Sequence, residues 1–165
     1  MKMLTMLLIA FALTVPAANA QKMSDCGLAV HHSTKKVKGK DPIELAPLPA
    51  GKALVYVVRP THFGAAIQTK LSMDGKWMGV NMANSYFVFL ADPGEHKFCS
   101  QSENASRLSL TLEAGKTYFL QQHIRSGFFK AENELTQLDD KHGHEALDKC
   151  KRIIFWEKGK PRPAT

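Results

Sequence analysis

Short apolar runs alternate with tight-turn residues along the stretch Leu71–His96. Apolar and polar residues alternate from 67 to 73, which is typical of a half-buried strand. Asp74-Gly75 then precedes a second short apolar run, Trp77–Val80. Asp-Gly between two such runs is a strong hairpin signal, because both central residues of a type I′ turn need a positive φ. The pattern therefore predicts a hairpin whose turn consists of Asp74 and Gly75.

Turn chemistry recurs at Asp92-Pro93-Gly94. Pro93 fixes its own φ, and Gly94 accepts a left-handed conformation. We therefore expect the strand Tyr86–Leu90 to fold back on the strand His96–Ser100. Together with the first hairpin, this gives a meander of four strands.

Three further strands complete the expected fold. Ala53–Val58 is almost continuously apolar, as in a strand buried on both faces, whereas 108–112 alternates and predicts a half-buried strand. The third is Thr117–Ile124. Seven short strands separated by turns predict an all-β fold, a single antiparallel β-sandwich of the immunoglobulin, transthyretin or PEGA-like type.

The C-terminal part gives weaker signals. Glu132–Leu138 is compatible with an added edge strand, and Gly143–Cys150 predicts a short helical segment. The apolar patch Ile153–Trp156 either docks on the sheets, which we expect, or is exposed for a partner.

The chain begins like an exported protein. Lys2 is followed by an apolar run over 3–15 and by Ala18-Asn19-Ala20, which is typical of a signal peptide cleaved after Ala20. The run is shorter than the roughly 20 apolar residues that span a bilayer. Because Cys26 does not directly follow small residues, we expect release into the periplasm or medium rather than lipid anchoring. The expected organisation is a signal peptide (1–20), a basic flexible arm (21–50), a β-sandwich domain with a C-terminal extension (51–157) and a basic tail (158–165).

The formal net charge is +7, and a lysine run lies in the arm. Its candidate contact residues are Lys35, Lys36, Lys38 and Lys40. A basic surplus favours acidic partners, such as a membrane surface or an envelope polymer, over long range. A run of like charges is also compatible with a simply hydrated chain. Nucleic-acid binding is not expected, because the lysines cluster in the tails while the aromatic residues alternate as core residues.

Three cysteines lie after the expected cleavage site, where thiols are normally oxidised. We favour a bond between Cys99 and Cys150, because it would fix the C-terminal segment to the meander. A bond from Cys26 to either of the others is the alternative.

Several motifs together resemble a known bacterial family. Met73-Asp74-Gly75, Pro93-Gly94-Glu95-His96 and Ala114-Gly115-Lys116-Thr117 occur in the order found in the family called domain of unknown function 2846, and they also resemble PEGA-type repeats. The likeness covers roughly 51–147. It implies an exported bacterial sandwich without established activity or catalytic residues, and often a lipoprotein. This chain differs by lacking a lipid-attachment motif and by carrying a long basic arm.

No catalytic motif is present, so we expect neither enzyme activity nor a cofactor. Asp74 is interpreted as a turn residue. The sharper alternative is a periplasmic zinc or copper site, because imidazole is a usual ligand of these metals. Its candidate ligands are His31, His32, His142 and His144. The leading hypothesis is a non-enzymatic envelope module that binds a polymer, a membrane surface or a protein.

Overall fold

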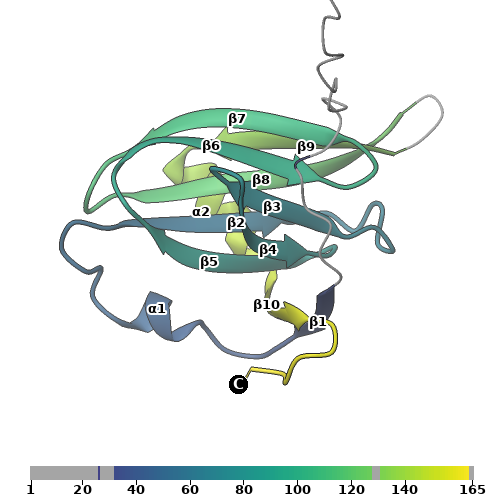
Figure 1. The fold of residues 1–165 in the computed structure, drawn as a ribbon, viewed down its shortest axis with the longest axis horizontal. Coiled ribbons are helices and arrows are strands. Elements are labelled where there is room, and N and C mark those ends of the chain that lie inside the picture. Colours follow the sequence, from purple (N-terminus) through teal and green to yellow (C-terminus); the bar gives the residue numbers. More distant parts are fainter. Residues whose placement is uncertain (1–25, 27–31, 128–130, 164–165) are drawn as a thin grey trace, which may run out of the picture.

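The computed structural model describes residue 26 and residues 32–127 and 131–163. Figure 1 shows two β-sheets, formed within these residues by ten strands and accompanied by two helices. The elements in chain order are β1 (His32–Lys36), α1 (Pro42–Leu45), β2 (Ala53–Arg59), β3 (Thr69–Met73), β4 (Lys76–Asn81), β5 (Ser85–Ala91), β6 (Gly94–Gln101), β7 (Ala105–Leu112), β8 (Thr117–Ser126), β9 (Ala131–Leu138), α2 (Asp140–Asp148) and β10 (Lys151–Glu157).

The six-stranded sheet has the order β1-β10-β5-β2-β8-β9, and the four-stranded sheet has the order β4-β3-β6-β7. A β-rich chain with two sheets is therefore confirmed. The expected count of about seven strands is too low, since β1, β9 and β10 are added to the central set. The expectation of purely antiparallel pairing is also wrong, because β2 runs parallel to β8 and β10 runs parallel to β5. Both parallel pairs join strands that are distant in the sequence, where no turn signal can indicate direction.

The first hairpin forms as predicted. β3 pairs antiparallel with β4, and Met73 lies opposite Lys76. Asp74 has a φ of 52° and Gly75 a φ of 76°, so both central residues of the turn are left-handed. The Asp-Gly pair therefore fixes this register through its backbone conformation.

The second predicted hairpin does not form. β5 lies in the six-stranded sheet and β6 in the four-stranded sheet, so the turn at Pro93-Gly94 carries the chain from one sheet to the other. β5 is instead paired with β2 and β10, and β6 with β3 and β7. Turn residues predict a change of direction, but the hydrogen-bonding partners of the two strands decide whether they remain neighbours.

The main apolar core is shared by the two sheets. The six-stranded sheet contributes Val55, Phe87 and Leu120, while the four-stranded sheet contributes Leu71 and Phe98. All five side chains are almost completely buried. Burial of large apolar side chains on both inner faces is the main force that holds the sheets together.

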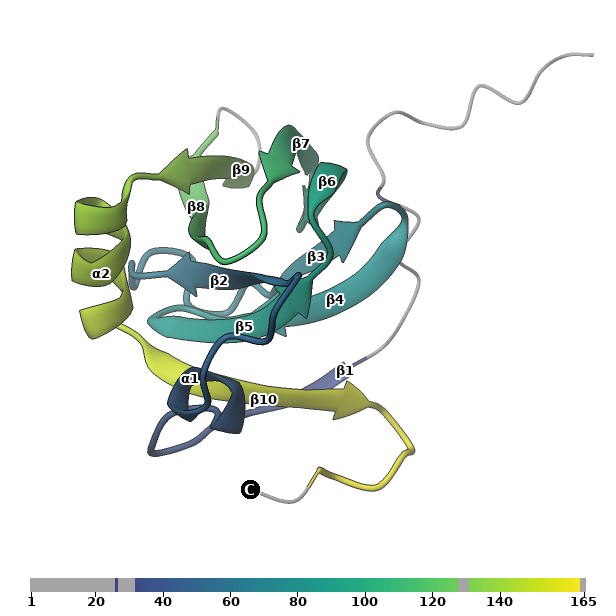
Figure 2. The same cartoon turned by 90° about the vertical axis from the view of Figure 1, so that its left-hand side faces the viewer.

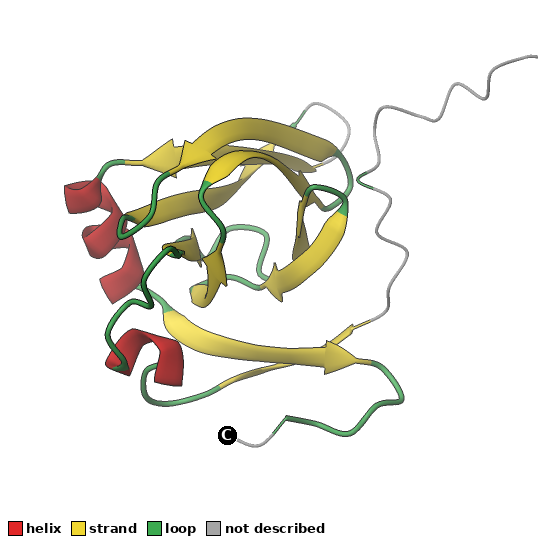
Figure 3. Cartoon of the chain, turned by 60° about the vertical axis from the view of Figure 1, so that its left-hand side comes forward, coloured by secondary structure: helices red, strands yellow, loops and turns green. Residues whose placement is uncertain are grey.

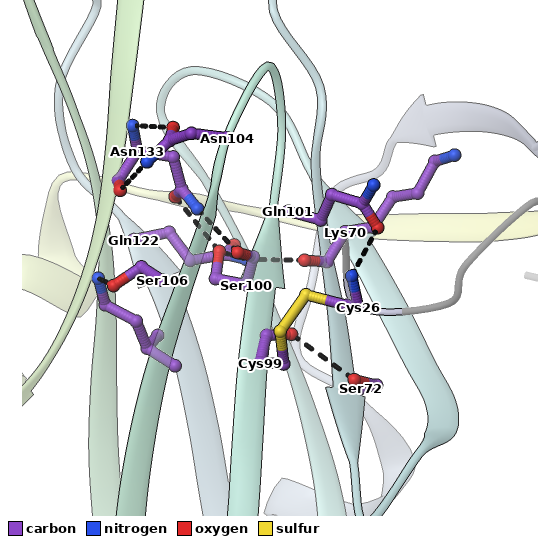
Figure 4. Close-up of a disulfide and its surroundings, with 11 residues drawn as sticks. Cys26, Lys70, Ser72, Cys99, Ser100, Gln101, Asn104, Ser106, Gln122 and Asn133 are labelled. Atoms are coloured by element: carbon purple, nitrogen blue, oxygen red, sulfur yellow. Dashed lines mark hydrogen bonds between the residues drawn. A yellow bond between two sulfur atoms is a disulfide. The ribbon is translucent and has the colours of Figure 1, made fainter. Parts of the chain in front are cut away.

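A buried polar network crosses the same space. Gln122 on β8 accepts hydrogen bonds from Thr69 (3.0 Å) and Asn81 (3.1 Å), and it donates one to Ser100 (2.9 Å). Ser100 in turn donates to Asn133 on β9 (3.0 Å). These five side chains are fully or almost fully buried, so each needs its partner. Figure 4 shows Gln122, Ser100 and Asn133 within this network.

Helix α2 packs on the six-stranded sheet through a glycine (Figure 3). A Cβ atom added to Gly143 would lie 2.2 Å from Cγ of Phe119, a buried residue of β8. Only a residue without a side chain permits this approach. The expected C-terminal helical segment is confirmed, and Ala146 and Leu147 complete its apolar contact with the sheet.

The expected basic flexible arm (21–50) is partly ordered. It contains β1 and the short helix α1, whose Asp41 and Glu44 form a capping box. Glu44 accepts hydrogen bonds from the phenols of Tyr86 (2.8 Å) and Tyr56 (3.4 Å). Burial, followed by the neighbouring Glu44 carboxylate, raises the pKa of Tyr56 to about 12. The order of this segment comes from contacts with residues distant in the sequence. Such order leaves no periodic pattern in the local sequence, so it was not predicted.

The favoured disulfide is wrong: Cys99 is bonded to Cys26, with a Cα–Cα distance of 5.8 Å, and Cys150 is free. Figure 4 shows the bond between Cys26 and Cys99 of β6. The backbone N–H of Cys26 also donates to Gln101 (3.3 Å). Cys150 lies instead in the apolar cluster next to α2, on the six-stranded sheet, while Cys99 belongs to the four-stranded sheet.

The glycine contact predicts that Gly143→Ala lowers the free energy of unfolding by about 1–3 kcal/mol, because the new methyl group overpacks Phe119. This is a net loss, since alanine by itself favours a helix by about 1 kcal/mol. Urea unfolding of the purified protein measures the change. Asp148→Ala, at an exposed position of the same helix, is the control and is expected to stay within about 0.5 kcal/mol. A more stable Gly143→Ala variant would contradict the packing argument.

Candidate anion-binding site

The two ends of the described chain meet in one antiparallel pair of strands. β1 pairs with β10 along its whole length, from His32 opposite Glu157 to Lys36 opposite Ile153. Figure 2 shows β10 below the rest of the six-stranded sheet, with β1 beside it. The lysine-rich segment of the arm therefore lies next to the C-terminal basic residues.

β10 is held by its apolar side chains. Ile153 is buried, and the ring of Phe155 meets Phe87 (5.4 Å between centroids) and Trp77 (5.0 Å) edge to face. Gly79 makes room, since a Cβ there would lie 2.8 Å from Phe155. Docking of the patch Ile153–Trp156, rather than exposure, is thereby confirmed.

The side chains of β1 that face inward fix this strand as well. His32 stacks on Trp77 with ring centroids 3.8 Å apart. Thr34 donates a hydrogen bond to the sulfur of Met82 (3.2 Å), and the ammonium of Lys36 donates to the carbonyl of Ala83. β1 is therefore positioned by the loop after β4 as well as by β10.

Two adjoining concavities lie beside this pair of strands. The larger, of about 430 Å³, is lined by Lys35, Lys36, Val37, Lys38, Arg152 and Arg162. The smaller, of about 260 Å³, is lined by Val37, Lys38, Gly39, Tyr86, Cys150, Lys151 and Arg152. They share Val37, Lys38 and Arg152, and we call the combined depression the basic trough.

The trough carries six cationic side chains and few opposing charges. Arg152, whose side chain is only 10% exposed, is paired with Asp41 at 3.0 Å. The guanidinium of Arg162 lies 6.0 Å from the ring centroid of Trp156, in the range of a cation–π contact. This surplus of positive charge, held in a hollow, attracts anions more strongly than the same cations would on separated tails.

Three of the four predicted lysines line the trough, namely Lys35, Lys36 and Lys38. Lys40 lines neither concavity. Arg162 belongs to the predicted basic tail (158–165), whereas Lys151 and Arg152 were not predicted as members of this site. The available signal was the apolar patch 153–156, which indicated that flanking basic residues would be brought to the surface of a sheet.

The histidines do not converge within the described residues. Nδ1 of His142 forms a hydrogen bond with Oδ2 of the helix-capping Asp139 (2.6 Å). The ring of His144 instead packs edge-on against Phe119, with ring centroids 5.0 Å apart. His32 stacks on Trp77, and His31 lies outside the described residues. No group of three or more potential metal ligands occurs in the part of the chain that the structure describes.

The smaller concavity of the trough is also lined by a cysteine, Cys150. Cys150 is half-buried, and burial raises its pKa to about 11. Because the thiolate is the nucleophile and metal ligand, this thiol is suited to packing rather than to either role at neutral pH.

Asp74 and His96 form a separate polar pair that joins the two turns. His96 Nδ1 lies 2.6 Å from Asp74 Oδ2, and its Nε2 lies 2.9 Å from the carbonyl oxygen of Asp92. Asp74 also accepts a hydrogen bond from the backbone N–H of Lys97 (2.8 Å), and this bond lowers the pKa of Asp74. The carboxylate raises the pKa of His96. Both nitrogens of His96 are therefore engaged, and the interpretation of Asp74 as a turn residue agrees with this geometry.

The family described as "Protein of unknown function (DUF2846)" matches residues 49–134. An uncharacterized protein of Haemophilus influenzae is 30% identical over 105 residues, which is 63% of this chain and 62% of the relative, so the chain spans less than two thirds of its length. No solved structure matches the chain. Among the described residues, neither helix has the length and apolar character needed to cross a membrane.

The pair between Asp74 and His96 predicts a pH-dependent contribution to stability. The lowered pKa of Asp74 makes its contribution present above pH 3.8 and lost as the pH falls below this value. The raised pKa of His96 makes its contribution present below pH 6.5 and lost as the pH rises through the higher folded value. His96→Gln should therefore lower the free energy of unfolding most between pH 3.8 and pH 6.5. The loss should be no more than about 1 kcal/mol, because Asp74 is half exposed.

Urea unfolding of wild type and variant across this pH range measures that difference. His62→Gln, in an exposed loop, is the matched control and should leave the pH profile unchanged. Parallel profiles for wild type and His96→Gln would show that the pair does not form.

Proposed function

The chain belongs to the DUF2846 family, proteins of unknown function, and we propose that it is an exported, non-enzymatic binding module of the bacterial cell envelope that holds an anionic component in the basic trough. The observation that carries the proposal is the convergence of Lys35 and Lys38 with Arg152 and Arg162, from opposite ends of the sequence, around one hollow. An electrostatic contact of this kind contributes about 1 kcal/mol per cation near an anionic surface.

Export is part of the proposal. The expected signal peptide lies outside the described residues. The bond between Cys26 and Cys99 is compatible with an oxidising compartment, where such bonds persist. This bond also ties Cys26 to the four-stranded sheet.

A binding role rather than an enzymatic one is supported by the chemistry of the side chains at hand. Cys150, in the trough, is held in the thiol form by its raised pKa. Lys and Arg side chains at the trough are suited to binding anions. The shared core of the two sheets is also compatible with the β-sandwich of PEGA-like modules, to which we assign the fold as part of this proposal.

Neutralising one lysine of the trough tests the proposal. Lys38→Gln should weaken binding to vesicles that contain phosphatidylglycerol, or to an immobilised acidic polysaccharide, by about fivefold at low salt. Lys40→Gln removes the same charge two residues away, outside the trough, and should change binding less than twofold. Binding of the wild type should fade at about 0.5 M salt, because exposed charges are then screened.

Co-sedimentation with the vesicles and with the polysaccharide beads measures both effects. Equal losses for Lys38→Gln and Lys40→Gln would show that total charge rather than the trough governs binding. Absence of binding to both probes at low salt would refute the anion-binding function.

A further inference from the structure

We propose that the ligand of the basic trough is a linear polyanion that occupies both concavities at once; this inference rests on the proposed anion-binding function. The two hollows adjoin and share Lys38 and Arg152. Each also has cations of its own: Arg162 lines only the larger hollow, and Lys151 lines only the smaller one. An extended chain with successive negative groups would therefore meet a cation at each step.

Arg152 is the central group of this arrangement. Its side chain is nine-tenths buried, and one terminal nitrogen of its guanidinium donates to Asp41. The Nε of Arg152 is buried and has no hydrogen-bond partner in the described part of the chain. A buried donor without a partner is costly, so Arg152 has hydrogen-bonding capacity that its pair with Asp41 does not use.

Arg162 is held in place from the C-terminal side. The chain turns after β10, where the backbone N–H of Lys160 donates to the carbonyl of Glu157 (3.0 Å) and their side chains form an ion pair (3.2 Å). The turn returns Arg162 to the ring of Trp156. A cation supported in this way loses less conformational entropy on binding than one at the end of a free tail.

Two carboxylates contact residues that line the trough. Asp41 is paired with Arg152, and Glu44 accepts the phenol of Tyr86, whose ring lines the smaller hollow. Glu44 keeps its negative charge, because a neutral phenol does not cancel it, yet the six cationic residues that line the trough outnumber these two carboxylates.

Titration calorimetry with inorganic polyphosphate tests this inference on the mature protein. Long chains should bind at least tenfold more tightly than diphosphate at equal phosphate concentration, because only they reach both hollows. Lys151→Gln and Arg162→Gln should each weaken binding of the long chain by about fivefold, as expected for one cation near a negative ligand. The controls are Lys149→Gln and Lys158→Gln, which remove neighbouring charges outside the trough and should change affinity less than twofold.

The outcomes separate the two proposals. Equal affinity for diphosphate and long polyphosphate, or equal effects of trough and control variants, would overturn the linear polyanion while leaving anion binding intact. Tighter binding to phosphatidylglycerol vesicles than to polyphosphate would assign the trough to a membrane surface instead. Failure to bind any of the three probes at low salt would refute the proposed function itself.

Discussion

The pairing of β1 with β10 is the interaction on which the candidate site depends. β10 is aligned with β5 at only two positions, Lys151 and Arg152, whereas β1 pairs with it at five. Among the described residues, positions 153–157 of β10 therefore have β1 as their only strand partner. A two-stranded ribbon is marginally stable by itself. It is retained here because Phe155 packs against Phe87 and Trp77.

Bringing both basic ends of the chain together has an electrostatic cost, since like charges repel. Individual contacts offset part of this cost. Asp41 forms an ion pair with Arg152, and the carbonyl of Ala83 accepts a hydrogen bond from the ammonium of Lys36. The ring of Trp156 lies within cation–π distance of Arg162. The remaining charge of the trough is not offset within the described residues that line it. This uncompensated potential is what connects the fold with the proposed function, because an anionic ligand would relieve it.

Local features of the fold could be predicted from the sequence, whereas its long-range pairings could not. Asp74-Gly75 fixes its hairpin through backbone conformation, and this information lies in two adjacent residues. Pro93-Gly94 was correctly interpreted as a turn, yet the strands on either side belong to different sheets because their partners are distant in the chain. The same limit explains the disulfide, since the position of Cys26 depends on a segment without periodicity.

Only part of the candidate site could be predicted from the sequence. The lysine run was recognised by its charge, and three of its four members line the trough. The partners from the other end, Arg152 and Arg162, became apparent only once β10 was paired with β1. Gln122 illustrates a related difficulty: a polar residue on the apolar face of a strand is buried when other polar groups meet it there, and these come from three other strands.

The most direct test of the account is a nitrogen-15 NMR titration of the purified protein with long-chain polyphosphate at low salt. The account predicts that backbone amide signals of 35–39 and of 150–152, together with Arg162, shift in parallel and saturate at one common concentration. Shifts confined to one end of the chain, or centred on the outer face of the four-stranded sheet, would contradict a site built from both ends.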